Sequence, residues 1–265
     1  MYSFAGKFAL VTGGAQGLGF AYINQLLRCG IEGVTLVDVN NELGKLSTEA
    51  LIKEFGEKVI FACADVRNPD EFEAAFRTSI DHWKYLDIVV NNAGIVDEGR
   101  WELEISVNCA GTLRGVALSF QYMSNMKGGR GGIVINCGSI AGVDPYCVLP
   151  IYSATKSFVV GLGRAMGTPN YFEHTGVKVL TVCPGLTDTP IINDISNNVP
   201  FIMCPNIKEE TTATLQNLHL QPVQCVAEAL TAVIHKGDNG SVWVAEGSQT
   251  PYEIKFPARQ EMKIN

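Results

Sequence analysis

Tyr152 and Lys156 are the residues whose types and spacing suggest chemistry most directly. They are four residues apart, so on a helix they lie on one face, one turn from each other. A phenol has an ordinary pKa of about 10, and a nearby ammonium lowers it toward the range of an acid or base that works at neutral pH. Ser139, thirteen residues upstream, could hydrogen-bond the same substrate oxygen. An ordinary amphipathic helix with a half-buried Tyr and a surface Lys would show the same short pattern.

A glycine-rich turn forms a second group. Gly13, Gly17 and Gly19 directly follow the apolar run 8–12 and open a helical pattern. Glycines permit a tight turn and a close approach of backbone to a phosphate at the helix N-terminus. Asp38 lies nineteen residues beyond Gly19, where a carboxylate can bond the 2′-hydroxyl of an adenosine ribose. Because it would repel a 2′-phosphate, we expect NAD rather than NADP. A structural turn with a helix-capping Asp38 is the alternative.

These residues must be positioned by an alternation of apolar runs and helical patterns. The runs predict strands at 8–12, 34–38, 59–63, 87–91, 132–137, 176–182 and 241–245. Helices are predicted after the glycine-rich turn, around Tyr152, and at about 41–55, 69–82, 101–126 and 223–235. The Tyr152 helix should end near Thr168, because Pro169 follows. The alternation predicts an α/β fold: a doubly wound (Rossmann) parallel sheet of about seven strands, in a three-layer αβα arrangement.

One segment, residues 186–221, departs from this alternation and shows no clean period. A long excursion outside the carboxyl end of a strand is where α/β folds place binding lids. We therefore expect a single domain over residues 1–265, with a substrate lid at about 186–221. A structural excursion packed on the sheet is the alternative.

Composition favours a globular protein whose partners are small molecules. Of 265 residues, 46% are hydrophobic and 18% charged, and the net charge of −7 argues against nucleic acid as a partner. The eight cysteines form no Cys-x-x-Cys pair, so we expect small buried hydrophobes and neither disulfides nor a zinc site. The four His show no ligand spacing, so no metal is expected. Without a signal peptide or an apolar run of spanning length, we expect a cytoplasmic protein with no membrane span.

Together with Asn91-Asn92-Ala93-Gly94, Asp65-Val66, Asn108 and Pro184-Gly185, these motifs resemble the classical short-chain dehydrogenase/reductase family. They follow the family's order over about residues 6–190. The resemblance implies an NAD-dependent oxidoreductase with an alcohol or ketone substrate, in a homodimer or homotetramer. It implies that Tyr152 is the acid/base, that Lys156 lowers its pKa and bonds the nicotinamide ribose, that Ser139 orients the substrate, and that Asn108 kinks the long helix and holds a relay water.

The resemblance also implies a set of cofactor-binding residues along the cleft. These residues are Gly13, Gln16, Gly17, Leu18, Gly19, Asp38, Val39, Asp65, Val66, Asn92, Ala93, Gly94, Tyr152, Lys156, Pro184, Gly185, Thr187 and Thr189.

A narrower resemblance, over 121–124, 128–136, 139–142 and 150–152, is to the NAD-dependent 15-hydroxyprostaglandin dehydrogenases and the insect alcohol-dehydrogenase-like branch. It implies a secondary alcohol on an apolar, lipid-like substrate, in contact with Ser139, Leu149 and Tyr152. Leu149 stands where those dehydrogenases carry a substrate-holding Gln. The alternatives are a steroid, isoprenoid, retinoid or short-chain alcohol, a reductase that uses NADPH, or a non-catalytic NAD-binding protein.

Overall fold

In the part of the chain that the structure describes, the sheet holds eight strands in the order β3-β2-β1-β4-β5-β6-β7-β8. The computed structural model describes residues 2–192 and 220–264. All neighbouring strands are parallel except β8, which runs antiparallel to β7. The strands are β1 (Phe8–Thr12), β2 (Gly33–Asp38), β3 (Val59–Cys63), β4 (Ile88–Asn91), β5 (Gly132–Cys137), β6 (Val177–Pro184), β7 (Val242–Ala245) and β8 (Tyr252–Glu253).

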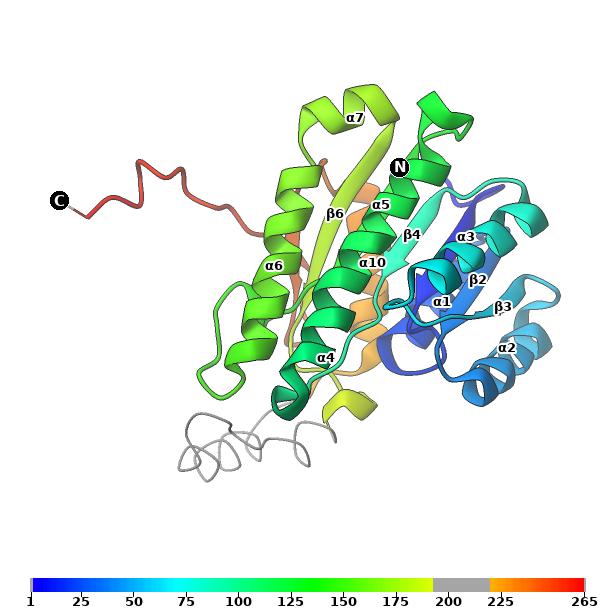
Figure 1. Cartoon of the computed structure of the whole chain (residues 1–265), viewed down its shortest axis with the longest axis horizontal. Helices are drawn as coiled ribbons and strands as arrows, with labels where there is room; N and C mark the ends of the chain where they lie inside the picture. The colour runs from blue at the N-terminus through cyan, green and yellow to red at the C-terminus, as the bar shows by residue number, and fades with distance from the viewer. Residues whose placement is uncertain (1, 193–219, 265) are drawn as a thin grey trace.

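Helices cover both faces of the sheet, as Figure 1 shows. The apolar core on one face joins the strands to α1 and α10, with α2 at its edge, and the core on the other face includes α3 and α5. The helices are α1 (Gly17–Arg28), α2 (Asn41–Phe55), α3 (Pro69–Trp83), α4 (Trp101–Ile105), α5 (Thr112–Met123), α6 (Pro150–Met166), α7 (Pro169–Thr175) and α10 (Val223–Lys236). This confirms the doubly wound three-layer architecture.

The predicted strand count of about seven is one short. The eighth strand, Tyr252–Glu253, has two residues, both exposed, so no buried apolar run announces it in the sequence. Ile254 and Phe256, directly beyond it, still pack against the core, and the chain then extends away from the body of the molecule (Figure 1).

The predicted long helix 101–126 is interrupted. It consists of α4, a π-helical turn at Ser106–Gly111 and α5, which ends at Met123. A π-turn inserts an extra residue into the helical ladder and is frequent at functional sites. The predicted end of the Tyr152 helix is confirmed, because α6 ends at Met166 and α7 begins at Pro169.

The expectation that the cysteines are buried is only partly correct. Cys137 and Cys183 are buried, whereas Cys29, Cys63 and Cys147 are exposed. Cys63 ends β3, which is an edge strand, so no neighbouring strand covers it on one side. Cys204 lies outside the described residues. Within the residues that the structure describes, no cluster of His, Cys, Asp and Glu could hold a metal ion, and no helix is long and apolar enough to cross a membrane.

Candidate active site

A cavity of about 840 Å³ opens at the carboxyl ends of the strands. Its walls come from the segments that follow β1 to β6, including both sides of the point between β1 and β4 where the strand order reverses. Open α/β sheets bind ligands in this crevice. Of the predicted cofactor, catalytic and substrate residues, Gly19 and Asn108 do not line the cavity, and the others do.

The glycine-rich turn forms one wall. Gly17 has a positive φ of 55°, which residues with a side chain rarely adopt. Gly19 lies behind the wall, and a Cβ there would stand 2.0 Å from the carbonyl oxygen of Gly13, so only glycine fits. The following helix α1 has no side-chain hydrogen bond at its N-cap, Gln16. Because Gly17 and Leu18, the first residues of this helix, line the cavity, the helix N-terminus offers N–H groups to a phosphate there.

The Asn-Asn-Ala-Gly motif fastens this turn to β4. The Asn92 side-chain amide donates to the carbonyl oxygens of Thr12 and Gly13, at 2.9 and 3.2 Å. The Thr12 hydroxyl in turn accepts hydrogen bonds from the backbone N–H groups of Asn92 and Ala93, both at 3.0 Å. These contacts set the width of the cleft between the β1 and β4 loops.

Asp38 stands at the end of β2, where its half-buried carboxylate lines the cavity. One carboxylate oxygen accepts the N–H of Ala15 and the other that of Asn40, each at 3.0 Å. Each oxygen has a second lone pair, so Asp38 can fix the glycine-rich turn and also accept a ribose hydroxyl.

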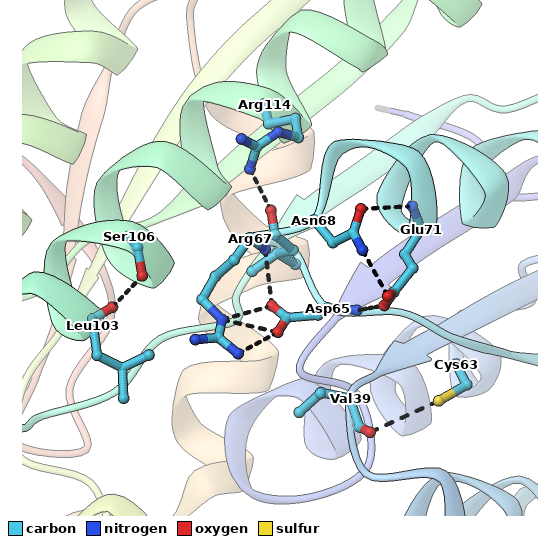
Figure 2. Close-up of polar contacts among 10 residues, drawn as sticks. Val39, Cys63, Asp65, Arg67, Asn68, Glu71, Leu103, Ser106 and Arg114 are labelled. Atoms are coloured by element: carbon cyan, nitrogen blue, oxygen red, sulfur yellow. Dashed lines mark hydrogen bonds and ion pairs between the residues drawn. The ribbon is translucent and has the colours of Figure 1, made fainter.

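Arg67 adds a positive charge that the sequence motifs did not indicate. Its guanidinium binds both carboxylate oxygens of Asp65, and the Asp65 N–H donates to Glu71 at 3.0 Å (Figure 2). Hydrogen bonds from Arg67 hold the pKa of Asp65 below its usual range. Asp65 and Arg67 both line the cavity next to Val66. Their charges neutralise each other, so the ion pair adds no net charge to the cavity wall there.

Tyr152 and Lys156 lie together on α6, as the four-residue spacing predicts. The Lys156 ammonium is 5.6 Å from the centroid of the Tyr152 ring and donates to the carbonyl oxygen of Cys137 at 2.9 Å. Ser139 follows β5, and its hydroxyl accepts the N–H of Ala141 at 3.1 Å. Two chain segments, α6 and the stretch at the end of β5, thus meet around Tyr152.

The pKa of Tyr152 is raised above its ordinary value, because burial disfavours the phenolate. The Lys156 ammonium lowers this pKa, as the sequence predicts, and so does the Ser139 hydroxyl. Burial outweighs both effects, so these protein groups alone do not bring the phenol into the range of a base at neutral pH.

Asn108 lies in the π-turn between α4 and α5, in agreement with the predicted kink. Its side chain makes two hydrogen bonds to the backbone of Ile95: it accepts the Ile95 N–H and donates to the Ile95 carbonyl oxygen, both at 2.9 Å. It also donates to the Thr155 hydroxyl at 3.1 Å. Asn108 therefore joins the loop after β4 to α6, and its predicted role in holding a relay water stays a prediction.

Pro184, the last residue of β6, and Gly185, Thr187 and Thr189 in the segment that follows all line the cavity. Buried Gln221 is bonded to it: the Gln221 side-chain amide donates to the Thr187 hydroxyl at 3.2 Å, and a backbone bridge pairs the two residues. The two ends of the predicted lid, 186 and 221, are thus adjacent. Residues 193–219 of that lid, including the apolar cluster 199–203, lie outside the described residues.

The part of the cavity around Tyr152 is apolar. Val96 and Leu149 are 4% exposed each and pack with partly buried neighbours, among which is Tyr152 itself. The other neighbours are Val148, Ile191 and Ile192. Leu149, predicted to contact substrate, therefore belongs to an apolar wall directly beside the phenol.

Two buried acids near Tyr152 were missed by the sequence analysis. Glu98 is 3% exposed and Glu104 is not exposed at all. In the sequence they stand in an acid-rich stretch, Asp97-Glu98-Gly-Arg-Trp-Glu-Leu-Glu104, which reads as a solvated helix face. The one available signal concerns Glu104: it stands four residues before Asn108, so on a helix the two lie on the same, inward face.

Comparison with known proteins identifies the family. Residues 7–200 match the family model for short chain dehydrogenases. The mouse 15-hydroxyprostaglandin dehydrogenase [NAD(+)] is 40% identical over 230 residues, which cover 86% of this chain and 85% of that protein. Alcohol dehydrogenase 1 of Ceratitis cosyra is 30% identical over 245 residues, covering 92% of this chain and 93% of that protein.

A solved structure of a short-chain dehydrogenase/reductase from Burkholderia phymatum, in complex with NAD, superposes with a TM-score of 0.77 over 89% of this chain and 88% of that chain, at 22% identity. This likeness concerns the fold. The chain belongs to the short-chain dehydrogenase family, and it is an oxidoreductase that acts on CH–OH groups.

Proposed function

We propose that this protein is an NAD-dependent dehydrogenase of a secondary alcohol on an apolar, lipid-like molecule, of the kind that 15-hydroxyprostaglandin exemplifies. The observation that carries the proposal is the apolar wall of Val96, Leu149 and Ile191 beside the Tyr152 phenol. An apolar substrate gains about 25 cal/mol for each Å² that it buries there, whereas a highly polar alcohol would lose hydrogen bonds to water. The relatedness to 15-hydroxyprostaglandin dehydrogenases supports the same substrate class.

The residues present fit a nicotinamide dinucleotide. A Cβ at Gly13 would lie 3.0 Å from Cα of Ala93, so a side chain at this position would crowd the cleft between the two loops. The first residues of α1, Gly17 and Leu18, line the same cavity as Asp38 and Lys156. We assign the pyrophosphate to the glycine-rich turn, the adenosine ribose to Asp38 and the nicotinamide ribose to Lys156. Asp38 favours NAD over NADP because a 2′-phosphate would meet its charge at short range.

NAD⁺, when bound, supplies the acceptor for the hydride that leaves the carbinol carbon. Ser139 holds the substrate hydroxyl by a hydrogen bond. Tyr152, as phenolate, accepts the proton of that hydroxyl, and Lys156 stabilises the phenolate by its positive charge. Since burial keeps the pKa of Tyr152 high in the protein alone, the phenolate form needs a second positive charge close by. Val96 and Leu149 keep water away from the reacting carbon.

The experiment that tests the proposal is a screen for NADH fluorescence with secondary alcohols: prostanoids, steroids, terpenols, retinoids and short-chain alcohols. We expect NADH formation that is fastest with the apolar alcohols, at least tenfold slower with NADP⁺, and absent in Tyr152→Phe. A purified protein that binds NAD but oxidises no alcohol would instead support a non-catalytic NAD-binding protein. Comparable rates with NADP⁺ would contradict the assignment to Asp38.

The lid at about 186–221 is part of the same proposal. Its two ends are joined by the bridge between Thr187 and Gln221, and Thr187 and Thr189 belong to the cavity lining. A cytoplasmic location and a homodimer or homotetramer stay predictions from the sequence.

A further inference from the structure

The first turn of α6 is short of hydrogen-bond acceptors of its own. A helix leaves its first N–H groups without partners inside the helix. The N-cap residue Leu149 makes no side-chain capping bond, and Pro150, the first helical residue, has no N–H to satisfy. The N–H groups of Ile151 and Tyr152 come next, and they need acceptors from elsewhere. Tyr152, the proposed acid/base, is therefore only the third residue of a helix whose end is not closed locally.

Glu98 closes this end from another part of the chain. One of its carboxylate oxygens accepts the N–H of Tyr152 at 2.9 Å, and the other accepts the N–H of Ile151 at 3.2 Å. The side chain is 3% exposed and lies in a short 3-10 turn, Glu98–Arg100, that precedes α4. A carboxylate at a helix N-terminus also interacts favourably with the helix dipole. Burial raises the pKa of Glu98, and the two N–H bonds act in the opposite direction.

The loop that carries Glu98 also forms a wall of the cavity. Gly94, Ile95 and Val96 line it, and a Cβ added to Gly94 would lie 3.4 Å from the Lys156 ammonium nitrogen. Asn108 holds Ile95 by two hydrogen bonds and α6 by one, to Thr155. Glu98 is thus a second tie between this loop and α6, and it attaches to the backbone of Tyr152 itself.

We propose that Glu98 is a positioning residue for Tyr152, because its carboxylate fixes the first turn of α6 and thereby the distance of the phenol from the cofactor-lining loop. The inference rests on the proposed role of Tyr152 as acid/base. The ends of helices fray, and a displacement of about 1 Å at a reacting group can lower a rate about 100-fold. Because the Glu98 carboxylate accepts two consecutive N–H groups, it restricts both the rotation and the displacement of the first turn of α6.

The sharpest variant is Glu98→Gln, which keeps the size of the side chain. Its amide has one oxygen, so one of the two N–H groups loses its acceptor and faces an NH₂ group instead. We expect kcat for a good alcohol substrate to fall about 10- to 100-fold, while the Kd for NAD, measured by quenching of protein fluorescence, changes less than twofold. The solvent deuterium isotope effect on kcat should increase, because proton transfer to Tyr152 becomes slower relative to other steps. The amide protons of Ile151 and Tyr152 should exchange faster with solvent.

A matched control removes another buried side chain that caps a helix N-terminus, at a residue that does not line the cavity. Ser124, 2% exposed, accepts the N–H of Met126 at 3.2 Å after α5. Ser124→Ala should lower the thermal midpoint but leave kcat and the isotope effect within twofold of wild type.

Several results would overturn the inference. An active wild type with a Glu98→Gln kcat within twofold would reject it and leave the proposed function intact. So would unchanged exchange of the Tyr152 amide, or a loss of kcat that Ser124→Ala reproduces at equal loss of stability. A wild type that binds NAD and oxidises no alcohol would reject the proposed function and the inference together.

Discussion

Glu104 is a buried acid whose charge should cost the protein stability at neutral pH. It has no exposed surface, and one carboxylate oxygen accepts the N–H of Asp97 at 3.2 Å. The other oxygen has no hydrogen-bond partner among residues 2–192 and 220–264. Burial raises the pKa of Glu104 from 4.5 to about 7, with smaller contributions in the same direction from the charges of Glu98 and Asp97. The Asp97 N–H and the Lys156 ammonium act in the opposite direction.

The sign of the effect follows from proton linkage. The folded state holds the Glu104 proton more tightly than the unfolded chain, so its contribution to stability is present below pH 4.5 and is lost as the pH rises toward 7. A rise of the pKa from 4.5 to about 7 corresponds to about 3 kcal/mol, at roughly 1.4 kcal/mol per pH unit. Because Glu104 has no exposed surface, solvent does not screen this effect.

Glu104→Gln is the variant that isolates this effect. The Gln amide oxygen can still accept the Asp97 N–H, and the side chain stays neutral at every pH. We expect its advantage over wild type in the free energy of unfolding to be about 1 kcal/mol at pH 5 and about 3 kcal/mol at pH 8. Urea unfolding at a fixed protein concentration, followed by circular dichroism, measures both values. Exposed Glu102, on the same helix, provides the control, and Glu102→Gln should stay within about 0.5 kcal/mol of wild type at both pH values.

An advantage of Glu104→Gln that does not change between pH 5 and pH 8 would refute the reasoning, because Glu104 would then not titrate in this range. A variant that is less stable than wild type at both pH values would refute it as well. That result would mean that the negative charge is favourable where it lies.

Four further predictions concern the site. Tyr152→Phe should lower kcat about 10³-fold in the NADH assay while the Kd for NAD stays within threefold, and a smaller loss than tenfold would contradict its role. Asp38→Ala should raise KM for NAD at least tenfold and increase the preference for NADP⁺, measured as the ratio of kcat/KM; an unchanged ratio would contradict the repulsion argument. Gly19→Ala places a methyl 2.0 Å from the Gly13 oxygen and should lower the free energy of unfolding by at least 1–3 kcal/mol in urea, with loss of NAD binding; a stable, NAD-binding variant would show that the turn relaxes easily. Leu149→Gln should raise KM for an unsubstituted aliphatic secondary alcohol about tenfold, since a buried amide without a partner costs about 1–3 kcal/mol; an unchanged KM would place Leu149 away from the substrate.

The parts of the site that the sequence predicts are those that depend on local geometry. Four-residue spacing on a helix brings Tyr152 and Lys156 together. The glycine-rich turn between β1 and α1 lies at the crevice because β1 is the strand at which the strand order reverses. The fold follows for the same reason, since buried apolar runs that alternate with helices have few ways to be covered on both faces.

What the sequence did not predict depends on contacts between distant segments. Glu98 and Tyr152 are 54 residues apart, and Gln221 and Thr187 are 34 apart. A charged residue in an acid-rich stretch gives no local sign that it points inward, so the sequence motifs do not single out Glu98 and Glu104. The raised pKa of Tyr152 belongs to this group too, because burial is a property of the whole fold, whereas the effect of Lys156 follows from spacing.

The bridge between Thr187 and Gln221 has a consequence for how this enzyme family can diversify. The Gln221 side chain is anchored to the carbonyl oxygen of Ala245 on β7 as well as to Thr187, and its own oxygen accepts the N–H of Ser248. The chain before residue 187 and the chain after residue 221 are therefore held together by one hydrogen-bond network around Gln221. Doubling the length of a closed loop costs only about 0.6 kcal/mol. The chain between these two residues can thus change in length or sequence at little cost in loop closure, and residues 193–219 can be exchanged with those of a relative without altering Asn108, Ser139, Tyr152 or Lys156.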